Sequence, residues 1–248
     1  MSIRSSENQL EAETTGRAKS PGATAPAWRI KIDRAARVLA LGAVAGPILL
    51  TVAWIVLGLT RPPVKTQWGV SGGVTGMITQ PFSGLGLGEN GYLFNAAFVV
   101  TGLLLLIGVY GAFQTIEDTG RPRWRKASLA LLALPGVGLL VDGIFTLETF
   151  MLHMLGFLLG CGLPVVGFVV AGLFLRRIPR WHRFATWLIL GSPLTLLLTI
   201  VFFANFDMAA MAAAKGLAGL TERILVIEVL AWYVAFGWIA FRSKRGMA

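Results

Sequence analysis

Residues 92–114 read YLFNAAFVVTGLLLLIGVYGAFQ, and none of these 23 residues is charged. A helix rises about 1.5 Å per residue, so an apolar run of about 20 residues is long enough to cross the roughly 30 Å hydrocarbon core of a bilayer. Such a run must be helical, because no water in that core can bond the backbone N–H and C=O groups. The stretch therefore predicts a transmembrane helix over Tyr92–Gln114.

Five further stretches have the same apolar character and carry few charges or none. They are Val38–Leu59, Ala127–Leu147, His153–Leu175, Phe184–Phe206 and Glu222–Phe241. The composition agrees, since 55% of the 248 residues are hydrophobic and only 14% are charged, whereas an ordinary soluble domain has about 25% charged residues. We therefore expect an all-α, polytopic transmembrane helix bundle with six spans. The composition excludes a disordered chain and argues against a soluble domain.

The basic residues predict the orientation of this bundle. Of the 22 lysines and arginines, 18 lie before the first span, between spans two and three, between spans four and five, or after the last span. By the positive-inside rule these segments are cytoplasmic, so we expect both termini in the cytoplasm and the protein in the cell (inner) membrane. The net charge of +10 is then explained by topology and by attraction to anionic lipid, and no nucleic-acid partner is needed.

We expect the chain to have three parts. Residues 1–37 are polar and rich in Ser, Thr, Gly and Pro, which is typical of a disordered tail, here a cytoplasmic one. Residues 38–241 are expected to form the six-helix transmembrane domain, and residues 242–248 a short basic cytoplasmic tail. No cleavable signal peptide is predicted, because the first apolar run is long enough to span the bilayer.

Polar residues inside the spans gather in the half opposite the arginine-rich segments. The candidate site residues in this outer half are Asn95, Asp142, Glu148, His153, Arg223 and Glu228. A carboxylate in hydrocarbon is costly unless it is paired, protonated or hydrated, so these positions predict a functional site. Arg223 and Glu228 lie roughly 140° apart around their helix, so we expect each to pair with Asp142, Glu148 or His153 on another helix. Together the residues predict an outward-facing polar cavity within the membrane.

The same residues also have a purely structural interpretation. Ion pairs and buried hydrogen bonds join transmembrane helices, and for Asp142 and Glu228 the sequence leaves both interpretations open. For Glu148, Asp207 and Glu222 we favour an ordinary solvated helix end. His153 is either an acid–base group or a hydrogen-bonded interfacial residue.

Glycine spacing predicts close helix packing in two of the spans. Gly42–Gly46 and Gly156–Gly160 both have the small-x-x-x-small spacing that lets two helices approach closely. We therefore expect spans one and four to pack inside the bundle.

The motifs of familiar nucleotide and metal sites do not occur in this sequence. It contains no P-loop and no HExxH motif. Cys161 is the only cysteine, and the two histidines are expected on opposite sides of the membrane, so we expect no zinc site and no cofactor. A calcium or magnesium site around Asp142, Glu148 and Asp207 is chemically allowed, but no spacing specifies it. The glycines of Gly84–Gly88 favour a turn rather than a phosphate-binding loop.

Residues 80–95, QPFSGLGLGENGYLFN, resemble the segment before a helix in a bacterial and archaeal membrane family named domain of unknown function 998 (DUF998). Val141–Thr146, Leu152–Phe157 and Gly219–Arg223 are similar to later parts of that family, which typically has an aspartate and a proline where this chain has Glu148 and no proline. The resemblance covers roughly residues 38–241. It implies a six-helix integral membrane protein, and it implies no particular activity.

Three functions are compatible with this sequence. The one we favour is non-enzymatic: the outward-facing cavity binds or moves a lipid or small amphiphile, or works as a proton-coupled carrier through Glu228 or Asp142. The second is an intramembrane lipid hydrolase or transferase that uses Asp142, Glu148 and His153 as acid–base groups, although no nucleophile is evident. The third is a structural or assembly subunit of a membrane complex. Membrane lipid is the only partner that the sequence predicts.

Overall fold

A computed structural model describes residues 27–117 and 120–243, with side chains from Asp33 onward. The chain divides into two units, residues 1–32 and residues 33–248. In the first unit the described residues, 27–32, are helical. All packing discussed below lies within the second unit.

The six predicted spans are confirmed, because residues 27–117 and 120–243 contain six helices long and apolar enough to cross a membrane. These are Asp33–Thr60, Gly91–Gln114, Pro122–Ile144, Leu147–Leu175, Pro179–Asn205 and Ala218–Phe241. In the part of the chain that the structure describes, the fold is all-α except for one two-stranded antiparallel hairpin, in which Val64 pairs with Ser71. The predicted fold class is therefore correct.

Several spans contain more than one helical element. The spans consist of α2 (Ala27–Ala40) and α3 (Gly42–Thr60); α5 (Gly91–Gln114); α6 (Pro122–Ile144); η2 (Leu147–Thr149), α7 (Phe150–Phe157), the π-helix η3 (Leu158–Gly162) and α8 (Pro164–Leu175); η4 (Pro179–Trp181) and α9 (His182–Asn205); and α11 (Ala218–Phe241). The connections contain β1 (Val64–Thr66), β2 (Gly69–Ser71), α4 (Gly73–Thr79), η1 (Phe82–Gly86) and α10 (Met208–Ala212). The first helix starts at Ala27, before the expected Val38. Residues 1–26 and 244–248 of the two predicted tails lie outside the described residues.

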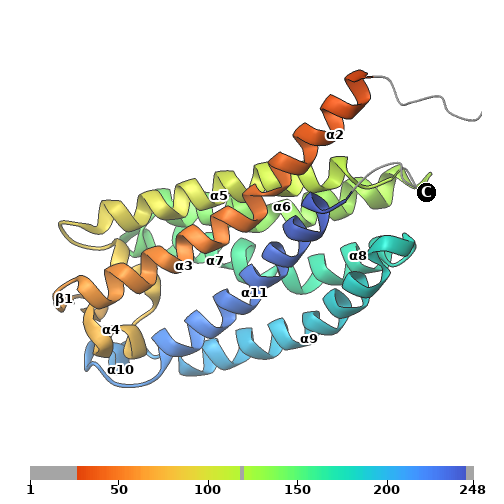
Figure 1. The fold of residues 1–248 in the computed structure, drawn as a ribbon. Coiled ribbons are helices and arrows are strands. Elements are labelled where there is room, and N and C mark those ends of the chain that lie inside the picture. Colours follow the sequence, from red (N-terminus) through yellow and green to blue (C-terminus); the bar gives the residue numbers. More distant parts are fainter. Residues whose placement is uncertain (1–26, 118–119, 244–248) are drawn as a thin grey trace, which may run out of the picture. The chain divides into compact units, whose positions relative to one another are not determined.

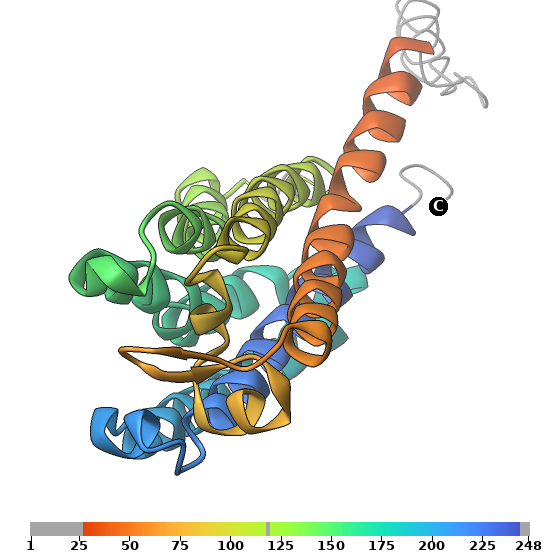
Figure 2. The same cartoon turned by 90° about the vertical axis from the view of Figure 1, so that its left-hand side faces the viewer.

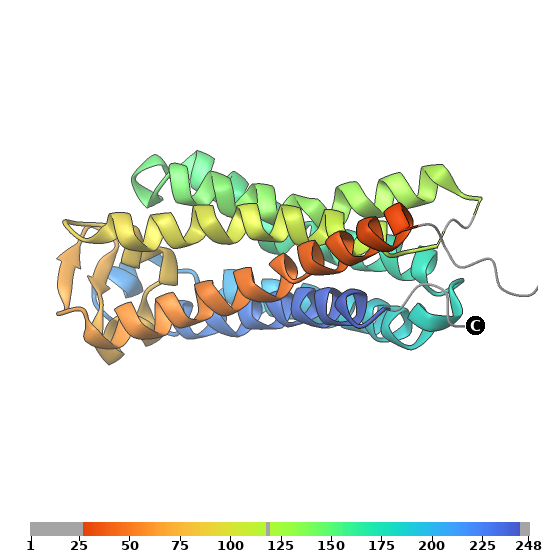
Figure 3. The ribbon, with the colours of Figure 1, turned by 45° about the horizontal axis from the view of Figure 1, so that its top comes forward.

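The long helices run side by side (Figures 1 and 3), with α5 packed on α3 and α6, and α11 packed on α3, α5 and α9. Glycine allows the closest of these approaches. A Cβ atom on Gly108 of α5 would overlap the backbone of Ala43 on α3. On the same pair of helices, Thr101 Oγ1 donates a hydrogen bond to the carbonyl oxygen of Gly46, at 3.1 Å. The small residues thus set the spacing of α3 and α5, as the Gly42–Gly46 pattern predicted.

One end of the bundle is built mainly from connections, and we call it the hairpin end. It carries β1, β2, α4, η1, η2 and α10, and Figure 2 looks onto it. Contacts of α10 with β2, of α4 with α11 and of η1 with η2 tie these elements together. The opposite end carries the α5–α6 and α8–α9 connections, which hold the clustered arginines. The candidate site lies beneath the hairpin end.

Candidate functional site

Between α4 and α5 the chain folds back into the hairpin end. Residues 80–87, which we call the inserted segment, are all buried. Most of the segment is the short 3₁₀ helix η1. Its Phe82 ring packs against the rings of Phe94 and Phe98 on α5, at centroid distances of 5.6 and 5.4 Å. The aromatic contacts hold the segment inside the bundle instead of leaving it as an exposed loop.

Backbone carbonyls of the inserted segment are bonded by side chains from three other elements. Arg61 donates from Nη1 to the carbonyl oxygen of Leu85 at 2.7 Å and from Nη2 to that of Leu87 at 2.6 Å. Asn95 Nδ2 donates to the carbonyl oxygen of Gly86 at 3.0 Å, and Ser71 Oγ donates to that of Gly84 at 2.9 Å. A short segment without regular partners needs such bonds, because an unpaired buried carbonyl is costly. Asn95, a predicted site residue, therefore supports the inserted segment.

The start of α11 bonds the other end of the segment. Glu222 accepts a hydrogen bond from the backbone N–H of Phe82, and Arg223 Nη1 donates to the carbonyl oxygen of Gln80 at 2.9 Å. A Cβ on Gly219 would overlap the backbone of Gln80, so glycine permits this approach. The guanidinium of Arg223 also lies over the ring of Trp54, 5.4 Å from its centroid. Glu222 and Arg223 are thus only 3% and 5% exposed, and the expectation that Glu222 is an ordinary solvated helix end was wrong.

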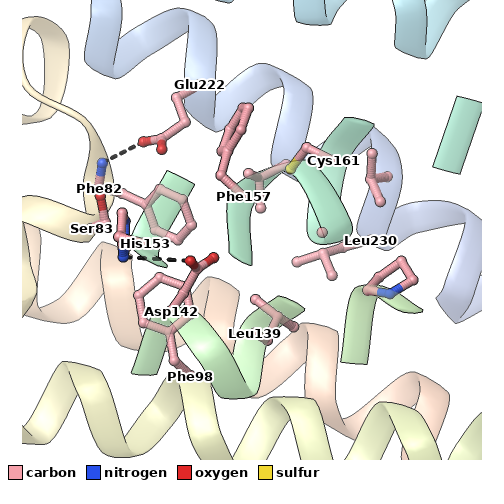
Figure 4. A pocket seen from close by; sticks show the side chains of 14 residues that line it. Phe82, Ser83, Phe98, Leu139, Asp142, His153, Phe157, Cys161, Glu222 and Leu230 are labelled. Carbon is pink, nitrogen blue, oxygen red and sulfur yellow. Dashed lines mark hydrogen bonds and ion pairs between the residues drawn. The ribbon is translucent and has the colours of Figure 1, made fainter. Parts of the chain in front are cut away.

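A small cavity of about 30 Å³ lies beneath the inserted segment (Figure 4). Asp142 on α6, His153 on α7 and Glu222 on α11 contribute its ionisable groups, and Phe82 and Ser83 form the wall on the side of the segment. The other lining residues are Phe98, Pro135, Leu139, Phe157, Gly160, Cys161, Val226, Val229 and Leu230. A water molecule needs about 10–15 Å³ of such a cavity, so this cavity accommodates about two water molecules. Two carboxyl groups and an imidazole from three different helices therefore meet, with the hydroxyl of Ser83, in a chamber lined mainly by apolar residues.

Asp142 and His153 form the closest ionisable pair in this chamber. Asp142 Oδ1 lies 3.4 Å from His153 Nδ1, and the two side chains are 9% and 7% exposed. His153 Nδ1 is 2.9 Å from the carbonyl oxygen of Phe145, which can only accept, so this nitrogen carries the hydrogen. That leaves the other ring nitrogen, Nε2, as an acceptor in the neutral ring. The pair has the composition of an acid–base site.

Two polar atoms that line the cavity are left without a bond. Asp142 Oδ1 and Ser83 Oγ are buried and have no hydrogen-bond partner among the described residues. Buried polar atoms are normally bonded by protein, water or ligand. Because both residues line the same cavity, a molecule placed there could bond both atoms at once.

The π-helix η3 shapes the far wall of the cavity. Its Gly160 and Cys161 line the chamber, and a Cβ on Gly160 would meet nothing within 4 Å. Pro164 follows at the start of α8, where it has no N–H to donate to a carbonyl of the preceding turn. Single π-helical turns of this kind are frequent at functional sites.

Glu148 and Glu228 lie outside the cavity. Glu148 is exposed on η2, as expected of a solvated helix end. Glu228 faces α9, where it accepts hydrogen bonds from Thr195 Oγ1 at 2.9 Å and from Trp232 Nε1. The expected pairing of Arg223 and Glu228 with Asp142, Glu148 or His153 was therefore wrong, because backbone carbonyls and α9 supply their partners instead.

Metal binding has little support in this geometry. Asp207 caps α10 by accepting from the N–H of Ala209 at 2.8 Å, so it does not join Asp142 and Glu148 in a calcium or magnesium site. Within residues 27–117 and 120–243, no group of three or more His, Cys, Asp or Glu side chains is placed to hold a metal ion. The buried carboxyl, imidazole and hydroxyl groups of this cavity can form hydrogen bonds and exchange protons.

Comparison with known proteins places the chain in a family. A family model described as protein of unknown function (DUF998) matches residues 43–239, and the chain belongs to this family. Neither the curated proteins nor the solved structures include a significant match.

Proposed function

We propose that this DUF998 family member is a non-enzymatic membrane protein whose buried cavity binds a small ligand, or the polar group of a small amphiphile, and moves it between the cavity and the hairpin end. The observation that carries the proposal is the meeting of Asp142, His153 and Glu222 in one water-sized chamber. Intramembrane ionisable residues that face a bundle interior mark ligand and ion pathways more often than not.

The volume restricts what the cavity takes up. About 30 Å³ accommodates about two water molecules, so a whole lipid does not fit. The terminal polar group of an amphiphile fits if the rest of the molecule stays among the outer parts of the helices. Larger occupants require the inserted segment to move, since Phe82 and Ser83 form one wall of the cavity.

The positive-inside rule assigns a side to the site. The opposite end of the bundle holds the arginine-rich connections, including Arg121, Arg123, Arg176 and Arg177, so that end is expected in the cytoplasm. The hairpin end then faces outward, and the cavity lies in the outer half of the membrane. A ligand would enter from the outside or from the outer leaflet.

Native mass spectrometry of the full chain in mild detergent tests this proposal. The unmodified protein is expected to carry a stoichiometric adduct that Asp142→Asn loses. Glu228→Gln is the matched control, because Glu228 bonds Thr195 and Trp232 instead of lining the cavity, and this variant should keep the adduct. A bare mass in all three proteins, or an adduct retained by Asp142→Asn, would contradict the proposal.

One observation favours a second candidate, an intramembrane acyl hydrolase or transferase. The sequence offers no evident nucleophile, but Ser83 Oγ lines the cavity with Asp142 and His153 and lacks a partner among the described residues. A serine, a histidine and an aspartate are the groups of a nucleophilic triad, in which histidine takes the serine proton and aspartate orients the histidine. Covalent labelling of the unmodified chain by a fluorophosphonate, absent in Ser83→Ala, would establish this function. Equal labelling of both proteins, or of neither, would reject it.

A further inference from the structure

We propose that the cavity recognises a primary ammonium group, carried by a small free amine or by the headgroup of an amphiphile. The inference deepens the proposed function and rests on the cavity taking up a ligand. It names the chemistry of that ligand from three features of the wall: its charge, its unbonded acceptors and its aromatic surface.

The charge of the lining favours a cation. Two carboxyl side chains, Asp142 and Glu222, line the cavity, and no lysine or arginine is among the described lining residues. The neighbouring Arg223 directs its guanidinium away, to the carbonyl oxygens of Gln80 and Gly219 and to the ring of Trp54. Arg223 still interacts electrostatically with Glu222, so Asp142 is the carboxyl group in this chamber that a bound cation would balance and that would repel an anion.

The unbonded atoms favour a ligand rich in hydrogen-bond donors. Asp142 Oδ1 has no hydrogen-bond partner in the described part of the chain, and a carboxylate oxygen only accepts. Ser83 Oγ can also accept a hydrogen bond. Glu222 accepts the N–H of Phe82 at Oε2, so its Oε1 can accept a hydrogen bond from a ligand. A primary ammonium has three donors and no acceptor. It therefore matches a wall whose free polar atoms are acceptors.

The size and the aromatic surface narrow the ligand further. A –NH₃⁺ group is about as large as a water molecule, and the volume of about 30 Å³ holds it together with one water or one carbon. Phe82, Phe98 and Phe157 line the same cavity, and ring faces attract a cation. A trimethylammonium group is too bulky for this volume and has no N–H donors. A bare metal ion is disfavoured because the described residues contain no suitable group of three ligands.

Thermal unfolding of the full chain in detergent, followed by tryptophan fluorescence, tests the inference. Methylammonium chloride should raise Tm relative to sodium chloride and tetramethylammonium chloride at equal ionic strength. Micelles doped with phosphatidylethanolamine, compared with phosphatidylcholine, form the second arm. A rise in Tm in the first arm identifies a free amine as ligand, and a rise in the second arm alone identifies a lipid headgroup. No rise in either arm overturns the inference.

Variants of residues that line the cavity test whether the amine that raises Tm binds there. Asp142→Asn should weaken the apparent affinity for the stabilising amine about tenfold to a hundredfold, the usual value of a charge-assisted hydrogen bond. Gly160→Ala should weaken it too, because the added methyl group enters the cavity without touching another atom within 4 Å. Glu228→Gln should leave the affinity within about twofold. Unchanged affinity in Asp142→Asn and Gly160→Ala would refute the assignment to this cavity.

The unmodified protein offers a measurement that needs no variant. Cys161 is the only cysteine of the chain and lines the cavity, so a small methanethiosulfonate reagent reports on access to it. The stabilising amine, at about ten times its Kd, should slow this reaction about tenfold, and equal rates with and without it would refute the inference. Native mass spectrometry separates this inference from the proposed function. If it finds an adduct that Asp142→Asn loses, but no ammonium compound raises Tm, the inference is wrong and the proposed function is still supported.

Discussion

Gly156 of α7 lies so close to Asp142 of α6 that a Cβ atom at residue 156 would overlap Asp142 Oδ1. The glycine thereby allows α7 to approach α6 at the level of the cavity. The same approach sets the distance of 3.4 Å between Asp142 Oδ1 and His153 Nδ1, since His153 lies one turn earlier on α7. Helix packing and the geometry of the ionisable pair are therefore one feature of the structure.

Gly156→Ala should consequently destabilise the protein and disturb this pair. We expect a loss of about 1–3 kcal/mol in the free energy of unfolding, which is usual for overpacking a tight contact. Denaturation in detergent measures it. Gly160→Ala is the matched control, because its Cβ would meet nothing within 4 Å and its stability should stay within about 0.5 kcal/mol of the unmodified protein. Equal losses in the two variants would contradict this account.

Glu222 should control how firmly the inserted segment covers the cavity. Glu222→Ala leaves the buried N–H of Phe82 unpaired, which costs about 1–3 kcal/mol. Modification of Cys161 by a thiol reagent should then become faster, because the segment opens more often. Glu222→Gln should have a smaller effect, since an amide oxygen can still accept. Glu148→Ala, at an exposed position, should change neither quantity, and faster modification in that control would point to general loosening instead.

Arg61 should be sensitive even to replacement by lysine. Its two terminal nitrogens bond the carbonyl oxygens of Leu85 and Leu87 at 2.7 and 2.6 Å, and a lysine ammonium is a single point that cannot reproduce this fork. Arg61→Lys should therefore increase amide hydrogen exchange at residues 84–88. The exposed Lys65 on β1 is the control, and Lys65→Ala should leave exchange at residues 84–88 unchanged. Unaltered exchange in Arg61→Lys would show that the aromatic contacts of Phe82 hold the segment alone.

The spans were predictable because a bilayer demands long apolar helices, whatever their packing. The meeting of Asp142 and His153 was also predictable, since a carboxyl and an imidazole within apolar runs need partners; their role as site residues stays a prediction. Glu222 was missed because it opens the predicted span Glu222–Phe241, where a carboxylate is normally solvated, whereas the helix begins at Ala218 and the burial of Glu222 depends on a segment 140 residues away. The apolar residues Phe82, Leu85 and Leu87 within a connection were the available signal that this segment folds inward.

The hydrogen-bond partners of Glu228 show which contacts can be predicted from the sequence and which cannot. Trp232 lies four residues later on the same helix, so that hydrogen bond could have been predicted from helical spacing. Thr195 could not, because it depends on how α9 packs against α11. The Gly156–Gly160 spacing predicted close packing at both glycines, and a Cβ on Gly138 of α6 would indeed overlap the backbone of both. That a Cβ on Gly160 itself would meet nothing within 4 Å could not be predicted, because it depends on the cavity.

The orientation of the bundle is a prediction that labelling in intact cells can check. In a Cys161→Ala background, Lys65→Cys at the hairpin end should react with a membrane-impermeant thiol reagent, because the positive-inside rule places that end outside. Arg123→Cys, in the first turn of α6 at the opposite end of the bundle, should react only after the cells are permeabilised. The reverse pattern would place the cavity in the cytoplasmic half, and the ligand would then enter from inside the cell.

The hydrogen bonds of Glu228 should contribute to helix association rather than to ligand binding. Thr195→Val keeps the shape of the side chain but removes a donor at 2.9 Å from the carboxylate, so we expect a loss of about 1–2 kcal/mol in stability. Thr199→Val is the control, because its hydroxyl bonds only the carbonyl oxygen of Thr195 within the same helix, at 2.8 Å. Stabilisation by the cavity ligand should be the same in both variants. If Thr195→Val also abolished that stabilisation, Glu228 would belong to the binding site, because losing its hydrogen-bond donor would then weaken ligand binding in the cavity.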